Sequence, residues 1–273
     1  MSEAANTIIP NIINIDGQDI PFKDGQTIMD AAFAAGVYIP HLCHRPGLTP
    51  HGSCKLCTVD ISNRIVSSSA SDRRTQTKFS VDTDSRSVSA CTTPAVAGQQ
   101  ISSNTPALNE VRKSITQMLF IEGNHLCPAC EKTGNCTLQA VAYHLGMLDG
   151  HFPQFFPRRE VDASHPTVML DRDRCILCEL CVRASREVDG KNVFAIAGRG
   201  VGARLIVNSA SGKLADSDLA TDDMATHICP VGAILIKEHG YEVPIGRRTF
   251  DLHRVGEVGL EKVILAKARH TDE

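Results

Sequence analysis

The placement of the cysteines restricts the fold of this 273-residue chain more than any other feature of its sequence. The chain has eleven cysteines, and together with one histidine they form three groups of four. These are Cys43, Cys54, Cys57 and Cys91; His125, Cys127, Cys130 and Cys136; and Cys175, Cys178, Cys181 and Cys229. An odd number of cysteines at short intervals is typical of metal ligation and not of disulfide pairing. Since this division leaves no cysteine over, the sequence predicts three metal centres with four protein ligands each.

The spacing of the first group is typical of a [2Fe–2S] centre. Plant-type ferredoxins follow the pattern C-x4-C-x2-C with a remote fourth cysteine. The interval between Cys43 and Cys54 is longer than in that pattern, but three clustered ligands and one distant ligand are retained. Gly52 and Ser53 are small enough to let backbone N–H groups approach the sulfur atoms and offset negative charge there.

The third group has the C-x2-C-x2-C spacing of a [4Fe–4S] ferredoxin, followed far downstream by Cys229-Pro230. In ferredoxins with two clusters, the Cys-Pro cysteine binds the other cluster. This chain has no second triad of that kind. The sequence therefore predicts that Cys229 completes the site formed by Cys175, Cys178 and Cys181.

The second group, His-x-C-x2-C-x5-C, fits two metals equally well. Zinc binds a set of three cysteines and one histidine in a tetrahedron, and a [4Fe–4S] cluster also requires four converging ligands. A zinc-stabilised scaffold without a redox role is therefore the alternative to an electron-transfer protein. His125 is the predicted fourth ligand of this group, and the more distant His144 and His151 are its competitors.

Local patterns around the first group predict a β-grasp domain. Asp16-Gly17 between apolar segments predicts a hairpin within residues 8–22. Thr27 to Asp30 form a capping-box pattern at the start of a helix that Gly36 ends. Residues 58–66 are predicted to form a second hairpin, and residues 67–89 a long surface loop.

The next segments predict two helices that enclose the second group. Thr105-Pro106 is a helix start, and an apolar stripe follows at Val111, Ile115, Met118 and Leu119. The second helix carries Leu138, Val141, Ala142 and Leu145 on one side. Around the third group we expect a helix at 182–188 and strands at 192–197, 203–208 and 234–236, after an extended segment at 150–165.

The predicted fold class is therefore α+β, in four parts. These are a [2Fe–2S] ferredoxin-type β-grasp domain at 1–98, a small helical domain around the histidine and three cysteines of the second group at 99–150, a ferredoxin-like [4Fe–4S] domain at 151–240, and a partner-contacting tail at 241–273. No nucleophile, general base or phosphate-binding loop is recognisable. The segment Gly198–Gly202 lacks the full G-x-G-x-x-G pattern and is interpreted as a turn.

Composition excludes several classes of protein. The chain is 42% hydrophobic and 22% charged, with a net charge of −3, so it has no bias toward nucleic acid or an anionic membrane. Its N-terminus lacks the basic and apolar regions of a signal peptide. No apolar run is long enough to span a bilayer. The sequence predicts a cytoplasmic protein.

Several segments together resemble a known family. They lie at residues 122–136, 170–175, 228–235 and 244–248. The order of the three centres is similar to the N-terminal part of the large iron–sulfur subunit of respiratory complex I and to the electron-input half of iron-only hydrogenases. Over nearly its whole length the chain resembles the iron–sulfur diaphorase (gamma) subunits of bidirectional NAD-reducing nickel–iron hydrogenases, in which the histidine also stands two residues before its first cysteine. The loops 67–89 and 209–220 are longer than this resemblance implies.

The resemblance implies a non-catalytic electron-transfer subunit of a hydrogen:NAD+ oxidoreductase. One [2Fe–2S] and two [4Fe–4S] clusters are expected on this chain. FMN and NAD are expected on a diaphorase partner subunit, and the nickel–iron site on a pair of small and large hydrogenase subunits. Single electrons would pass through this chain between those partners. The equivalent subunit of an NAD-dependent formate dehydrogenase or of complex I is the alternative within this class.

Overall fold

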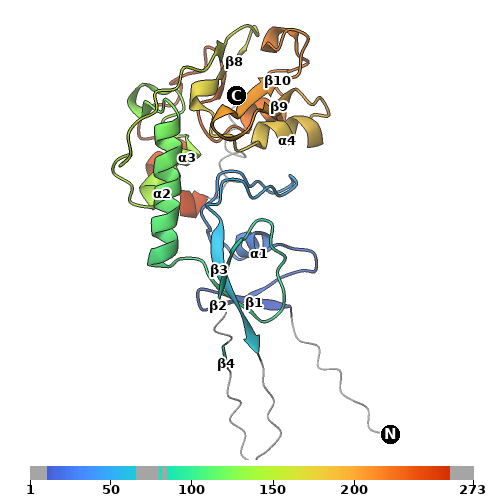
Figure 1. The fold of residues 1–273 in the computed structure, drawn as a ribbon, viewed down its shortest axis with the longest axis vertical. Coiled ribbons are helices and arrows are strands. Elements are labelled where there is room, and N and C mark those ends of the chain that lie inside the picture. The colour runs from blue at the N-terminus through green and yellow to red at the C-terminus, as the bar shows by residue number, and fades with distance from the viewer. Residues whose placement is uncertain (1–10, 66–79, 82–84, 259–273) are drawn as a thin grey trace, which may run out of the picture. The chain divides into compact units, whose positions relative to one another are not determined.

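The computed structural model describes residues 11–65, 80–81 and 85–258 (Figure 1). Within them the chain forms two compact units. The first comprises the described residues of Met1–Ile39 and Cys57–Asn109, and the second comprises those of Pro40–Leu56 and Glu110–Glu273. The division into four parts at residues 98, 150 and 240 stays a prediction.

A mixed β-sheet organises the first unit. Its strands are β1 (Ile12–Ile15), β2 (Gln18–Pro21), β3 (Thr58–Ile65), β4 (Ser80–Val81), β5 (Arg86–Ser89) and β6 (Gln99–Ser102). The strand order is β2-β1-β6-β3-β4, and β5 also pairs with β3. Strands β1 and β6 are parallel, and the other pairs are antiparallel. The sheet and helix α1 (Ile28–Ala34) share one aliphatic core. This is the predicted β-grasp arrangement.

Two local predictions in this unit are confirmed. Asp16 and Gly17 turn the chain between β1 and β2 with φ values of 51° and 89°, as a primed hairpin turn requires. At the start of α1, Thr27 Oγ1 accepts the Asp30 backbone N–H at 3.1 Å. The Asp30 carboxylate in turn accepts the Thr27 backbone N–H at 2.9 Å, which completes the capping box.

The predicted hairpin at residues 58–66 is wrong. The described residues of this segment form the single strand β3, which pairs with β5 and β6 rather than folding back on itself. Residues 86–89, assigned to a surface loop from their composition, are strand β5. Residues 67–79 and 82–84 of that predicted loop lie outside the described residues.

Helices α2 (Pro106–Glu122) and α3 (Thr137–His144) flank the second ligand group, as predicted. Thr105 Oγ1 accepts the Leu108 backbone N–H at 3.2 Å and so begins α2. The predicted apolar stripe on α2 is partly wrong, because Val111 and Met118 are exposed. The side chains of Arg112 and Thr116 are buried instead.

The rest of the second unit is a small α+β structure. Its strands are β7 (Val161–Asp162), β8 (Val168–Asp171), β9 (Phe194–Ala197), β10 (Arg204–Val207) and β11 (Ile234–Ile236). Its helices are α4 (Leu180–Glu187), α5 (Met224–His227) and α6 (Thr249–Leu252). Single 3-10 turns lie at Cys127–Ala129, Arg172–Arg174, Gly200–Gly202 and Leu214–Asp216. Strands β9 and β10 form a hairpin, and β11, β8 and β7 form an antiparallel sheet. Strand β8 is a central element here that the sequence did not predict.

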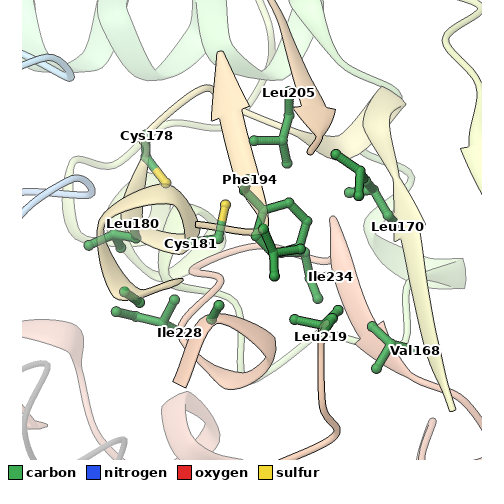
Figure 2. Packing of buried hydrophobic residues seen from close by; sticks show 14 of the residues in the cluster. Val168, Leu170, Cys178, Leu180, Cys181, Phe194, Leu205, Leu219, Ile228 and Ile234 are labelled. Carbon is green, nitrogen blue, oxygen red and sulfur yellow. The ribbon is translucent and has the colours of Figure 1, made fainter. Parts of the chain in front are cut away.

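The core of this ferredoxin-like part contains Leu170, Leu180, Phe194, Leu205 and Ile234. Figure 2 shows the side chains of Cys178 and Cys181 turned into the same apolar interior as Phe194. Aliphatic side chains thus pack around these two predicted metal ligands. Within the described ranges, none of the helices has the length and apolar character needed to cross a membrane.

Candidate iron–sulfur centres

Strand pairing brings two predicted ligands of the first group together in the first unit. Cys57 directly precedes β3, and Cys91 follows β5 after Ala90. The register that pairs Thr58 with Ser89 continues into a hydrogen bond of 3.0 Å from the Ala90 N–H to the Cys57 carbonyl. The two Sγ atoms lie 3.3 Å apart and both cysteines are buried.

The other two predicted ligands of this group, Cys43 and Cys54, lie in the Pro40–Leu56 segment of the second unit. A hydrogen bond from Cys54 lowers the pKa of the Cys43 thiol, so this pair can supply a thiolate. The buried Arg112 donates from Nε to the Leu56 carbonyl at 2.9 Å. That contact fixes the backbone between Cys54 and Cys57, which only Lys55 and Leu56 separate in the chain.

His125 lies just after the end of α2, and its Nε2 atom is buried without a hydrogen-bond partner. Burial, with the positive charges of Arg174 and Arg159, holds the pKa of His125 at about 4. The imidazole is therefore neutral near pH 7 and keeps a nitrogen lone pair for a metal. A side chain at Gly123 would bring its Cβ within 2.6 Å of Nε2, so a glycine is required there.

The three cysteines of the second group lie in the loop between α2 and α3. Burial raises the pKa of Cys136 to about 12 and also raises that of Cys127. Nearby thiols add to this effect, because Cys127 and Cys130 interact electrostatically with Cys136. A bound metal cation offsets the negative charge of buried thiolates and so favours their deprotonated form. This loop of neighbouring thiols therefore fits a metal centre.

A segment near the C-terminus holds this loop in place. The Arg248 guanidinium donates to the Thr133 carbonyl at 3.2 Å and forms two hydrogen bonds to the Asp251 carboxylate, at 2.7 and 2.8 Å. The Asn135 side chain accepts the Thr249 backbone N–H at 2.9 Å. The backbone between Cys130 and Cys136 is thus anchored from outside.

The four cysteines of the third group line a single cavity. This cavity contains about 340 Å³ of space not filled by protein atoms, part of it open to solvent. Its other walls include Ile196, Leu205, Val231 and Ile234. An enclosure with four thiols and aliphatic walls is the environment that a cubane cluster requires.

The C-x2-C-x2-C loop has the backbone shape needed to surround a cluster. Leu177 and Glu179 adopt positive φ values of 52° and 58°, so the chain curls around the cavity before α4 begins. Burial raises the pKa of Cys175 to about 11, and a hydrogen bond from the Leu177 backbone N–H partly offsets this. Such N–H groups also stabilise the negative charge of bound thiolates.

Arg183 on α4 connects the loop of the first group to the third group within the second unit. Its buried guanidinium donates from Nη1 to the Thr49 carbonyl at 2.8 Å. From Nη2 it donates to the carbonyls of Cys43 and Cys178. One nitrogen atom therefore donates to a backbone carbonyl of the first group and to one of the third group.

One aliphatic cluster contacts members of all three groups. It consists of Leu42, Leu56, Leu138, Val141, Val231 and Ala233. Packed against it are Cys54 of the first group, Cys136 of the second, and Cys175 and Cys229 of the third. The backbone also joins the last two groups, because the Thr137 N–H donates to the Pro230 carbonyl at 2.8 Å.

Among the residues described here, no three His, Cys, Asp or Glu side chains converge closely enough to hold a single metal ion. That finding does not bear on clusters, because no iron atom of a [2Fe–2S] or [4Fe–4S] cluster of this kind takes more than two protein ligands. Sequence reasoning missed Arg112, Arg174, Arg183 and Arg248, whose contacts fix the ligand-bearing backbone. No local pattern distinguishes these arginines from exposed ones, apart from the Arg-Arg pair at 247–248.

Three family models cover most of the chain. Residues 12–106 match the 2Fe-2S iron-sulfur cluster binding domain. Residues 112–151 match the NADH-ubiquinone oxidoreductase-G iron-sulfur binding region. Residues 168–236 match the 4Fe-4S single cluster domain. The three matches follow the order of the three ligand groups.

Individual relatives are subunits of oxidoreductases. The chain is 29% identical over 225 residues to the alpha subunit of NADPH-Fe(3+) oxidoreductase from Geobacter sulfurreducens, covering 24% of that protein. It is 29% identical over 229 residues to the mitochondrial iron-sulfur protein 1 of NADH dehydrogenase [ubiquinone] from Solanum tuberosum, covering 28% of it. The chain thus spans about a quarter of each of these two relatives.

The gamma subunit of the NAD-reducing hydrogenase HoxS from Cupriavidus necator matches over nearly its full length. The two are 36% identical over 250 residues, which is 91% of this chain and 97% of that subunit. A crystal structure of an NAD+-reducing [NiFe]-hydrogenase in the H2-reduced state contains a chain that is 44% identical, with a TM-score of 0.81 over 92% of this chain and 98% of that one. This chain belongs to the family of iron–sulfur electron-transfer subunits that includes the gamma subunit of NAD-reducing hydrogenase and the iron–sulfur subunits of complex I.

Proposed function

We propose that this chain relays single electrons through one [2Fe–2S] and two [4Fe–4S] clusters. The [2Fe–2S] cluster would be bound by Cys43, Cys54, Cys57 and Cys91. The second group, His125, Cys127, Cys130 and Cys136, would bind one [4Fe–4S] cluster. The third group, Cys175, Cys178, Cys181 and Cys229, would bind the other.

The observation that carries this proposal is the cavity lined by all four cysteines of the third group. Two features support the other groups. The buried Nε2 of His125 has no hydrogen-bond partner, as expected of a ligand. The Sγ atoms of Cys57 and Cys91 lie 3.3 Å apart, although Cys57 precedes β3 and Cys91 follows a different strand, β5.

An iron–sulfur cluster supplies reversible uptake and release of one electron at a time. The chain's own residues hold the ligands and keep water out. Buried aliphatic side chains such as Leu138 and Val231 fill the interior against which Cys136, Cys175 and Cys229 pack. This packing fixes the separation of the groups and lowers the local dielectric constant. Both affect the rate of electron transfer, and the dielectric constant also affects the reduction potentials.

Similarity over nearly the full length of a hydrogenase gamma subunit supports a proposal for the partners. We propose that the chain assembles with an FMN- and NAD-binding diaphorase subunit and with the small and large subunits of a nickel–iron hydrogenase. The chain then connects the flavin, where a hydride is divided into single electrons, to the metal site where hydrogen reacts. Clusters on reduced thiols also suit the reducing cytoplasm, where we place the complex.

Cys229→Ala provides the direct test in the anaerobically purified complex. The variant should lose or convert the EPR signal of one cluster and keep the other two. Cys136→Ala is the matched control and should affect a different signal. If Cys229→Ala leaves all three signals unchanged, Cys229 is not a ligand.

The identity of the co-purifying chains tests the proposed partners. Nickel in a co-purified large subunit is the expected result. Molybdenum in that position would instead indicate a formate dehydrogenase, and quinone reduction would indicate a complex I-type assembly.

A further inference from the structure

Arg174 belongs by sequence to the third group but contacts a ligand of the second. It directly precedes Cys175 and lies in the 3-10 turn Arg172–Arg174. Its Nη1 atom lies 3.8 Å from Cys130 Sγ, within reach of a long N–H···S hydrogen bond. This guanidinium is therefore placed between the Cys130 sulfur and the backbone of the third group.

Two carboxylates hold the guanidinium in this position. Its Nη1 donates to Glu131 Oε2 at 2.7 Å, and its Nε donates to Asp171 Oδ2 at 2.9 Å. The Arg174 side chain is only 20% exposed, so these contacts are partly shielded from solvent. An arginine fixed at both edges of its fork has little freedom to move away from the sulfur.

The backbone opposite Arg174 is shaped to admit this contact. A Cβ at Gly232 would come within 2.9 Å of Cys130 Sγ and within 3.4 Å of Arg174 Nη1. Gly232 lies three residues after Cys229 of the third group. Space for the sulfur and the guanidinium thus depends on this glycine.

We infer that Arg174 sets the reduction potential of the second centre by placing a fixed positive charge and a hydrogen-bond donor on the Cys130 sulfur. This inference rests on the proposed ligation of a cluster by Cys130. One-electron reduction adds negative charge to the cluster and its thiolates. A nearby cation stabilises that charge and so raises the potential. Glu131 acts in the opposite direction, because its carboxylate stands beside the same guanidinium and partly neutralises Arg174.

The test is an EPR-monitored redox titration of the second centre in the intact complex. Arg174→Gln removes the charge but keeps amide donors, and should shift the midpoint potential to a more negative value. Glu131→Gln removes the opposing charge and should shift it to a more positive value. Arg199→Gln removes an exposed cation from the turn after β9 and should leave the potential unchanged.

Opposite shifts of the midpoint potential in the two variants support the inference. If these residues only maintained the structure, the direction of the shift would not depend on the sign of the charge removed. If Arg174→Gln does not assemble, Glu131→Gln decides alone, because the contact of Arg174 Nε with Asp171 remains in that variant and keeps the guanidinium in place. An unshifted or more negative potential in Glu131→Gln overturns the inference. Cys130→Ala tests the proposed ligation separately from the role of Arg174. If that variant keeps the signal of the second centre, the proposed ligation itself is wrong.

Discussion

Cys57 and Cys91 are 34 residues apart in the chain, yet their Sγ atoms lie 3.3 Å from each other. The antiparallel register of β3 and β5 causes this approach, because Thr58 pairs with Ser89 at the end of both strands. The predicted fourth ligand of the first group, Cys91, is thus positioned by sheet pairing and not by a local motif.

Replacement of Cys91 should therefore act on one centre only. Cys91→Ala should remove the EPR signal of the [2Fe–2S] cluster and spare both [4Fe–4S] signals. The neighbouring Thr92→Ala, which changes an exposed side chain, should keep all three signals. Loss of a [4Fe–4S] signal in Cys91→Ala would contradict the grouping.

Replacement of His125 should change the second centre. His125→Ala leaves one iron without its ligand, so we expect conversion of this cluster to a three-iron form or its complete loss. His125→Cys exchanges a neutral ligand for an anionic thiolate, and any cluster that forms should have a lower potential. If His125→Ala keeps all three signals unshifted, His125 is not a ligand and His144 is the next candidate.

The buried Arg183 should support the loop that carries Cys43. Loss of its hydrogen bonds leaves the carbonyls of Cys43 and Thr49 without this donor, at a cost of about 2 kcal/mol for charged hydrogen bonds of this kind. We expect Arg183→Gln to speed the loss of the [2Fe–2S] signal when the complex is incubated with an iron chelator. Arg186→Gln, an exposed change on the same helix, should retain the wild-type rate. Equal rates in all three proteins would exclude this role.

Asp251 should stabilise the second centre without pH dependence near neutrality. Hydrogen bonds from Arg248 hold the pKa of Asp251 at about 2, below its usual 3.8. The stabilisation from this depressed pKa is fully present above about pH 4 and is lost only as the pH falls from there through about 2. Asp251→Asn should weaken the hold of Arg248 on the Cys130–Cys136 loop by about 1 kcal/mol.

The measurement for Asp251 is the rate at which the second cluster is lost in chelator, followed by EPR. Asp251→Asn should accelerate this loss by the same factor at pH 6, 7 and 9. An effect that disappears between pH 6 and 9 would show that a different group titrates.

Local chemistry predicted much of this fold. The primed turn at Asp16-Gly17 and the capping box of Thr27 and Asp30 depend on residues a few positions apart, so the sequence alone determines them. The cysteine spacings are also local, because a cluster restricts its first three ligands to one loop. Positions that depend on distant packing were less predictable.

The errors came from non-local contacts. Residues 58–66 resembled a hairpin, but the partners of β3 are β4, β5 and β6, which come later in the chain. The side of α2 that is buried depends on what packs against it, so Val111 is exposed while Arg112 is buried. Arginine is usually a surface residue, and nothing beside Arg112, Arg174 or Arg183 in the sequence marks the contacts that bury or enclose them.

We propose that this chain carries three iron–sulfur clusters and not structural zinc. Iron, zinc and acid-labile sulfide in the anaerobically purified full-length chain test it most directly. Two irons in the first centre and four in each of the others predict ten irons per chain, with sulfide in equal number and little zinc. Zinc near three ions per chain, with almost no labile sulfide, would show that the three groups bind structural zinc instead.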